Sequence, residues 1–137
     1  MGLERANNCI RIPVSLNDKF FRTWVEFLTP LHHLTSREQD VLASLLKNRF
    51  ELSNSISDEA LLDKVLMSDD IKAKVKAECG VSDAFFQVIL GKLKKTKIIV
   101  DGRINPPLIP KRLNKDDQYF TLLLLFELNA GDTKQAI

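Results

Sequence analysis

Few side chains in this sequence have the types and spacing that catalysis requires. The sequence holds no glycine-rich nucleotide loop, no His-Glu-x-x-His zinc motif and no Gly-x-Ser-x-Gly nucleophile motif. Asp69 and Asp70 open a predicted helix, where the positive end of the helix dipole favours carboxylates without any catalytic role. The adjacent His32 and His33 have no further ligands at metal-binding spacing, so we expect a solvated loop pair. We therefore expect no enzyme activity, no cofactor, no metal and no small-molecule substrate.

The two cysteines, Cys9 and Cys79, are too few and too far apart for a disulfide framework or a zinc site. Cys79 falls on the apolar face of a predicted helix, where we expect a small core residue. No apolar run approaches the roughly 18 residues of a membrane span, and the N-terminus lacks the apolar core of a signal peptide. The sequence predicts a protein without membrane contact, located inside a cell or packaged into an assembly made there.

The basic residues are unevenly spread along the chain. The 137 residues carry a net charge of +2, and the 45% hydrophobic and 28% charged composition is ordinary for one globular domain with a core. Residues 92–115, however, hold eight basic residues against one acidic residue, Asp101. The eight are Lys92, Lys94, Lys95, Lys97, Arg103, Lys111, Arg112 and Lys115. Such a stretch can neutralise nucleic-acid phosphates or face an acidic neighbour, and a solvated basic surface is the plainer alternative.

The basic stretch begins inside a predicted helix-turn-helix. Residues 69–79 predict a first helix, and Gly80 ends it because glycine adopts the left-handed conformation without strain. Ser82 caps a second helix, whose apolar residues recur at three- and four-residue steps. These inward residues are Phe86, Ile89, Leu90 and Leu93. A β-branched run follows, and the Asp101-Gly102 pair after it predicts a tight β-hairpin turn.

The segments before this unit predict a strand and several helices. Residues 1–16 form an N-terminal arm in which Ile10, Ile12 and Val14 alternate with other residues, as in a short edge strand that can join a partner's sheet. A single domain is expected over residues 17–128. Its first helix spans about 17–28, a Thr35–Glu38 capping box opens the next, and Ser57 caps an extra helix over 58–67.

The segments after the hairpin are less regular. Residues 103–117 predict an extended, basic, proline-bearing arm, in which Leu108 and Ile109 are extended because Pro110 follows. Tyr119–Leu128 is the strongest strand candidate; its leucine run also fits a helix by periodicity alone, but its position after the hairpin favours a strand. Residues 129–137 form a polar tail.

Helix, turn, helix and hairpin in this order resemble a winged helix, and the resemblance covers roughly Leu34 to Leu128. The expected fold class is therefore α+β and mostly helical: a winged helix-turn-helix with an N-terminal strand and a C-terminal β-hairpin, or wing. Winged helices serve both DNA binding and protein contacts, so the fold alone does not decide the function.

The outward face of the second helix favours protein contacts. If the apolar repeat faces the core, Phe85 and Val88 point outward and form an exposed apolar patch, which usually marks a protein interface. Gln87 is the one good base-reading side chain on this face, and Asp83 would be repelled by phosphates.

A second resemblance concerns residues 20–46 and 102–110. The run FFRTWVEFLTPLHHLTSREQDVLASLL, together with GRINPPLIP, is similar to small proteins of crAss-like tailed phages. Some small proteins of tailed phages form rings in the neck between portal and tail. The resemblance implies a virion component, made in the host cytoplasm and repeated around a ring with side-by-side contacts to copies of itself and to neighbouring virion proteins.

The main hypothesis is thus a non-enzymatic assembly component of a phage head–tail connector, with DNA contact possible through residues 92–115. The expected protein-interface residues are Ile10, Ile12, Val14, Phe85, Val88, Arg103, Leu108, Ile109, Lys111 and Arg112. The alternative is a winged-helix transcriptional regulator in the bacterial cytoplasm. Its expected DNA-contacting residues are Gln87, Lys92, Lys94, Lys95, Lys97 and Arg103.

Overall fold

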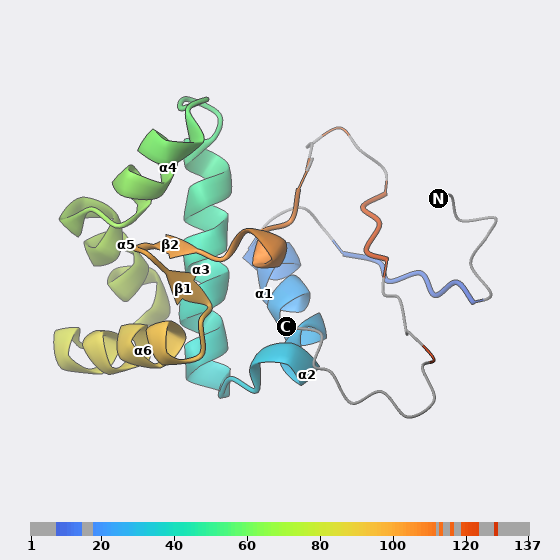
Figure 1. Cartoon of the computed structure of the whole chain (residues 1–137), viewed down its shortest axis with the longest axis horizontal. Coiled ribbons are helices and arrows are strands. Elements are labelled where there is room, and N and C mark those ends of the chain that lie inside the picture. Colours follow the sequence, from blue (N-terminus) through green and yellow to red (C-terminus); the bar gives the residue numbers. More distant parts are fainter. Residues whose placement is uncertain are drawn as a thin grey trace.

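The computed structural model describes residues 8–14, 18–111, 113, 116, 119–123 and 128. Within them the chain is mostly helical and carries one two-stranded antiparallel sheet, which confirms the predicted α+β class (Figure 1). The helices are α1 (Asp18–Phe27), α2 (Thr29–His32), α3 (Ser36–Leu52), α4 (Glu59–Leu66), α5 (Asp69–Cys79) and α6 (Asp83–Lys95). The strands are β1 (Ile99–Val100) and β2 (Arg103–Ile104), and the 3-10 turn η2 (Pro106–Leu108) follows them.

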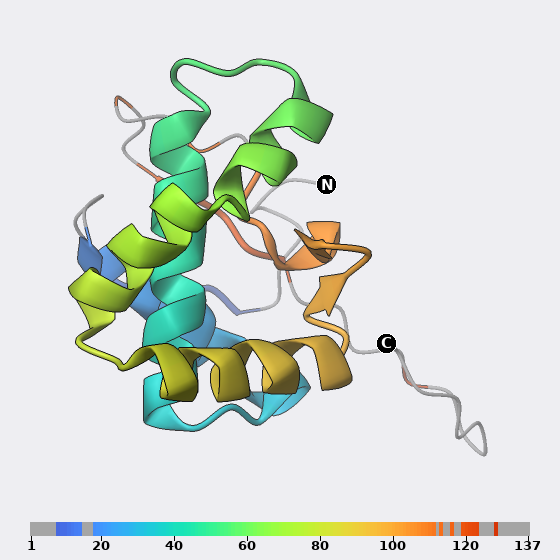
Figure 2. The same cartoon turned by 90° about the vertical axis from the view of Figure 1, so that its left-hand side faces the viewer.

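Helix α3 is the centre around which the other elements pack. Figure 1 shows α1 on one side of it and α4, α5 and the hairpin on the other. In Figure 2, α6 lies at the end of the molecule where α3 begins. The predicted capping box is confirmed, because Thr35 Oγ1 accepts from the Glu38 amide and Glu38 Oε1 accepts from the Thr35 amide. The apolar stripe of α3 is buried as the periodicity predicts, through Val41, Leu42, Leu45 and Leu46.

The turn between α5 and α6 forms at the residues that the sequence predicts. Gly80 has φ +63°, and the next amide, that of Val81, donates back to the Lys76 carbonyl at 3.1 Å. This is the backbone pattern of a helix end closed by a left-handed residue. Ser68 and Ser82 cap α5 and α6 through their hydroxyls, as expected.

The hairpin is also confirmed, although its strands are only two residues long. Ile99 pairs with Ile104, and Val100 pairs with Arg103. Asp101 and Gly102 both have positive φ, +54° and +76°, as a two-residue type I′ turn requires. Ile98, Ile99 and Ile104 enter the core, so the hairpin is fastened to the helices by its apolar face.

Three predicted strand or extended segments differ in the structure. Residues 8–14 form no strand with the sheet of this chain, and Ile10 is 85% exposed; pairing with a partner's sheet stays a prediction. Residues 119–123 are not strand either, and 124–127 lie outside the described residues, as do 1–7 and 129–137. Leu108 belongs to η2 rather than to an extended arm: its amide donates to the Asn105 carbonyl at 2.9 Å, and prolines are tolerated in a first helical turn because their missing N–H would have no partner there.

Two local predictions are wrong for reasons of hydrogen bonding. Asp58, not Ser57, caps α4, and its carboxylate accepts from the Ala60 amide at 3.0 Å as a charge-assisted bond. His33 is exposed as expected, but His32 is buried in α2. Its Nδ1 accepts from the Leu34 amide at 2.9 Å, so Nε2 carries the hydrogen and donates to the Val25 carbonyl at 2.8 Å.

Candidate functional site

The outward face of α6 carries the apolar patch that the sequence predicts. Phe86, Ile89, Leu90 and Leu93 are buried, which turns the remaining positions of the helix to the surface. Phe85 is 42% exposed and Val88 66% exposed. The other exposed residues of this face include Ala84, Gln87 and Gly91. Gln87 is the one side chain among the exposed α6 positions 83–88 that is suited to reading base edges.

The N-terminal end of α6 is acidic and is tied to α5. Lys76 Nζ lies 2.7 Å from the carboxylate of Asp83 and 5.7 Å from the ring centre of Phe86. Asp83 is itself 89% exposed at the side chain. A carboxylate at this position faces whatever approaches the first turn of α6, and it would repel a phosphate.

The C-terminal end of α6 and the hairpin are basic. The five basic residues there share two properties: they are exposed, and no ion pair joins them to another described residue. They are Lys92, Lys94, Lys95, Lys97 and Arg103, hereafter the basic surface. Five of the six residues of the predicted nucleic-acid set thus lie at this end of α6 and on the hairpin, and Gln87 lies on the same helix.

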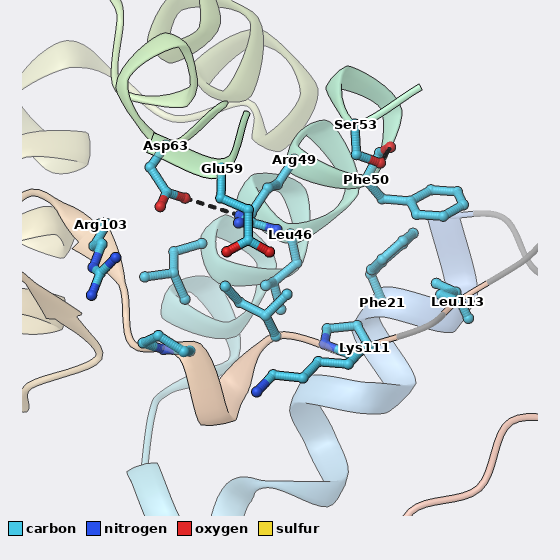
Figure 3. Close-up of a pocket in the computed structure, with 14 residues that line it drawn as sticks. Phe21, Leu46, Arg49, Phe50, Ser53, Glu59, Asp63, Arg103, Lys111 and Leu113 are labelled. Atoms are coloured by element: carbon cyan, nitrogen blue, oxygen red, sulfur yellow. Dashed lines mark hydrogen bonds and ion pairs between the residues drawn. The ribbon is translucent and has the colours of Figure 1, made fainter. Parts of the chain in front are cut away.

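A pocket of about 490 Å³ lies between α3, α4, β2 and the residues after η2 (Figure 3). Arg49 and Asp63 form a largely buried ion pair at 3.0 Å on one side, and Phe21 and Phe50 lie on the other. Apolar side chains supply much of the remaining lining. Because Arg49 and Asp63 satisfy each other, this pair fastens α4 to α3, and the other charged side chains of the lining are Glu59, Arg103 and Lys111.

Three of the predicted interface residues line this pocket: Arg103, Ile109 and Lys111. Arg103 and Lys111 are exposed, whereas Ile109 packs partly against the core. The carbonyl of Leu108 accepts a hydrogen bond of 2.9 Å from the indole Nε1 of Trp24. The first half of the predicted arm is therefore fastened to its own chain, while Arg112 and Lys115 lie outside the described residues.

The remaining predicted interface residues lie apart from α6. Ile10, Ile12 and Val14 are all exposed, and Arg11 lies 5.9 Å from the ring centre of Tyr119. Figure 1 shows this segment on the side of α3 opposite to α6. The predicted protein-interface residues therefore fall into separate surfaces, not into one site.

A cluster around Glu78 was missed by sequence reasoning. Its carboxylate accepts from Lys47 Nζ at 2.6 Å, Asn48 Nδ2 at 2.8 Å and Ser44 Oγ at 2.9 Å. Burial raises the pKa of Glu78, but these three hydrogen bonds outweigh burial and hold the pKa below its usual value. Lys47 and Asn48 lie three and four residues after Ser44, and the three donors therefore share one face of α3. This spacing is the sequence signal that could have predicted a polar cluster there. The cluster joins α3 to α5 and is structural.

Cys79 lies beside this cluster, half-buried against the core as the sequence indicated. Burial raises the pKa of its thiol, so at neutral pH it stays protonated and unreactive.

Within the described ranges, no three His, Cys, Asp or Glu side chains gather in a way that could hold a metal ion. In the same part of the chain, no helix is both long and apolar enough to cross a membrane. Comparison of the sequence with protein-family models and with curated proteins, and of the fold with solved structures, finds no match. The function is therefore inferred from the exposed surfaces of the molecule.

Proposed function

We propose that this chain is a non-enzymatic structural component of a tailed-phage virion, in the head–tail connector, and that α3, α5, α6 and the hairpin act as a winged helix used for protein contacts. The observation that carries the proposal is the outer face of α6. A winged-helix DNA reader presents polar or basic side chains there, whereas this helix exposes Phe85 and Val88 behind an acidic first turn.

Other surfaces support an assembly role. The exposed segment with Ile10, Ile12 and Val14 offers apolar side chains to a neighbour. The pocket with Arg103 and Lys111 offers a concave surface on another part of the molecule. Different surfaces on one chain suit the side-by-side contacts of a ring, in which each copy uses two unlike faces.

A second candidate is a DNA-binding transcriptional regulator, because the basic surface has no ion-pair partners among the described residues. In this case Gln87 would read a base while Lys92, Lys94 and Arg103 contact phosphates. The candidate ranks second because Gln87 stands alone between apolar neighbours.

The proposal is tested by the mass of the purified chain over a range of concentrations, measured by light scattering for the wild type and for Val88→Gln. We expect the wild type to associate, and Val88→Gln to raise the apparent dissociation constant about tenfold, since one buried valine contributes about 1.5 kcal/mol. Lys64→Gln changes an exposed position on α4 and serves as the control. A wild type that stays monomeric at every concentration, or association that Val88→Gln leaves unchanged, would contradict the proposal.

A further inference from the structure

We infer that the basic surface, Lys92, Lys94, Lys95, Lys97 and Arg103, binds the phosphate backbone of duplex DNA without reading its sequence. This interaction is independent of the protein contacts proposed for Phe85 and Val88. It uses the C-terminal end of α6 and the hairpin, whereas those contacts use the N-terminal half of α6.

The first observation is a contrast in charge pairing. Basic side chains in the helical body are mostly paired with carboxylates. The pairs are Arg22 with Glu26 and Asp40, Arg37 with Asp40, Lys47 with Glu78, Arg49 with Asp63, Lys74 with Glu51, and Lys76 with Asp83. On the basic surface, none of the five cations has such a partner among the described residues. Their mutual repulsion is therefore uncompensated within the described structure.

The second observation is the backbone of Lys97. Its φ is +63°, in the left-handed region that non-glycine residues avoid. The amide of Lys97 donates to the Lys94 carbonyl at 3.1 Å, and the amide of Ile98 donates to the Leu93 carbonyl at 2.9 Å. This is the helix ending in which glycine is usual at the left-handed position.

The same chain uses glycine at the equivalent position of α5. Gly80 has φ +63° there, with the same pair of backbone hydrogen bonds behind it. The other described non-glycine residues with positive φ are His33 and Asp101, and both types tolerate this region better than lysine does. The side chain of Lys97 is exposed and gains nothing from burial, so its strained position is explained by the charge it presents.

The helix dipole explains only part of the basic surface. Cations in the last turn of a helix offset its negative end, which accounts for some of Lys92, Lys94 and Lys95. Lys97 and Arg103 lie beyond the helix. Arg103 projects from the strand opposite Val100, so the cations extend from α6 onto the hairpin.

Phosphate is the partner that fits these cations. Lysine ammonium groups on flexible stems act as point charges, which suit phosphates spaced along a backbone rather than base edges. The only acidic residue between Lys92 and Arg103 is Asp101. The base-reading end of α6 is apolar, so the contact carries no sequence information.

The experiment is a fluorescence-anisotropy titration of the full chain against a labelled 30-base-pair duplex and a shuffled version of it, from 50 to 300 mM salt. The affinities for the two duplexes should agree within about twofold. The logarithm of the association constant should fall linearly with the logarithm of the salt concentration. Each phosphate contact that is removed should make this slope less steep by about 0.9. The double variant Lys94→Gln/Lys95→Gln should therefore lower the slope by about 2. Lys64→Gln, an exposed lysine on α4, should leave it unchanged.

Three variants at position 97 separate charge from strain. Lys97→Gln removes the charge and keeps the strained backbone, so it should weaken binding without raising the melting temperature. Lys97→Gly removes both, and should weaken binding while raising the melting temperature by about 2–4 °C. Lys97→Arg should retain binding.

The inference is overturned if the dissociation constant for the duplex is above 100 µM at 50 mM salt. It is also overturned if the lysine variants leave the slope of log affinity against log salt concentration unchanged. Polyglutamate that competes as well as duplex DNA at equal charge would move the partner to an acidic protein. Val88→Gln should leave the DNA slope unchanged, and Lys94→Gln/Lys95→Gln should leave self-association unchanged. Failure of this inference is therefore distinguishable from failure of the assembly role.

Discussion

At the scale of single residues, Glu78 has the most clearly defined role. It accepts three hydrogen bonds from α3, and one of the donors, Asn48, is almost completely buried. These bonds favour the ionised carboxylate and so lower the pKa of Glu78 in the folded protein. Stability must therefore depend on pH through this group.

We predict that Glu78→Gln lowers the free energy of unfolding at pH 7 by about 0.5–1 kcal/mol, because the ion pair with Lys47 is lost and solvent screens a carboxylate at this exposed position. Because the pKa of Glu78 is lower in the folded than in the unfolded protein, its carboxylate stabilises the fold at any pH above the unfolded-state pKa. This contribution is lost as the pH falls through the folded-state pKa. The variant should consequently lose less stability than the wild type between about pH 5 and pH 3.

Urea unfolding at several pH values measures both effects. Glu51→Gln, which removes an ion pair with Lys74 whose two side chains are both about half exposed, is the matched control and should change the stability and its acid dependence much less. Identical acid dependence in wild type and Glu78→Gln would refute the role given to the carboxylate.

Among the elements, α6 combines a buried inner face with an outer face that no other described element covers. Gly91 illustrates this, because it lies inside the helix and an added Cβ would meet nothing within 4 Å. Glycine inside a helix is less favourable than alanine, and no contact in the described structure requires it.

We predict that Gly91→Ala stabilises the isolated protein by about 0.5–1 kcal/mol, because alanine has less backbone entropy to lose on folding. The free energy of unfolding is measured from the midpoint and slope of urea unfolding curves of the monomeric protein. Gly80→Ala is the contrasting variant, since φ is +63° there, and it should destabilise the protein by about 1 kcal/mol. If Gly91→Ala destabilised the monomer, the open outer face assigned to α6 would be wrong.

Most elements were predictable because their signals are local. The Thr35–Glu38 box, the Gly80 turn and the Asp101–Gly102 hairpin depend on neighbouring residues alone, and all are found. The strand expected at 10–14 depends on a partner edge, and the two-stranded sheet of this chain does not pair with it. His32 was misjudged because its burial depends on two backbone groups outside α2, the Val25 carbonyl in α1 and the Leu34 amide after α2.

At the scale of the whole molecule, the segment after the hairpin returns across the helical body. Trp24 holds the Leu108 carbonyl, and Leu108 and Ile109 pack partly on the core. The sequence indicated an extended basic arm, but it could not show that apolar residues within the arm fit against α1. This packing depends on contacts far apart in sequence, which periodicity does not report.

We predict that Trp24→Phe loosens this segment, because phenylalanine keeps most of the apolar contact and loses the bond to the Leu108 carbonyl. The loss should be about 1 kcal/mol. Limited trypsin digestion should cleave faster after Lys111 in the variant than in the wild type. Cleavage after Lys64, on α4, is the internal control, and equal acceleration at both sites would indicate general unfolding instead.

The central claim is that the outer face of α6 contacts protein and does not read bases. Repeated selection of wild-type binders from a pool of random-sequence duplexes tests it most directly. We predict that duplexes are retained through the basic surface but that no sequence motif is enriched. An enriched motif that disappears with Gln87→Ala would contradict the claim and establish the chain as a sequence-specific DNA reader.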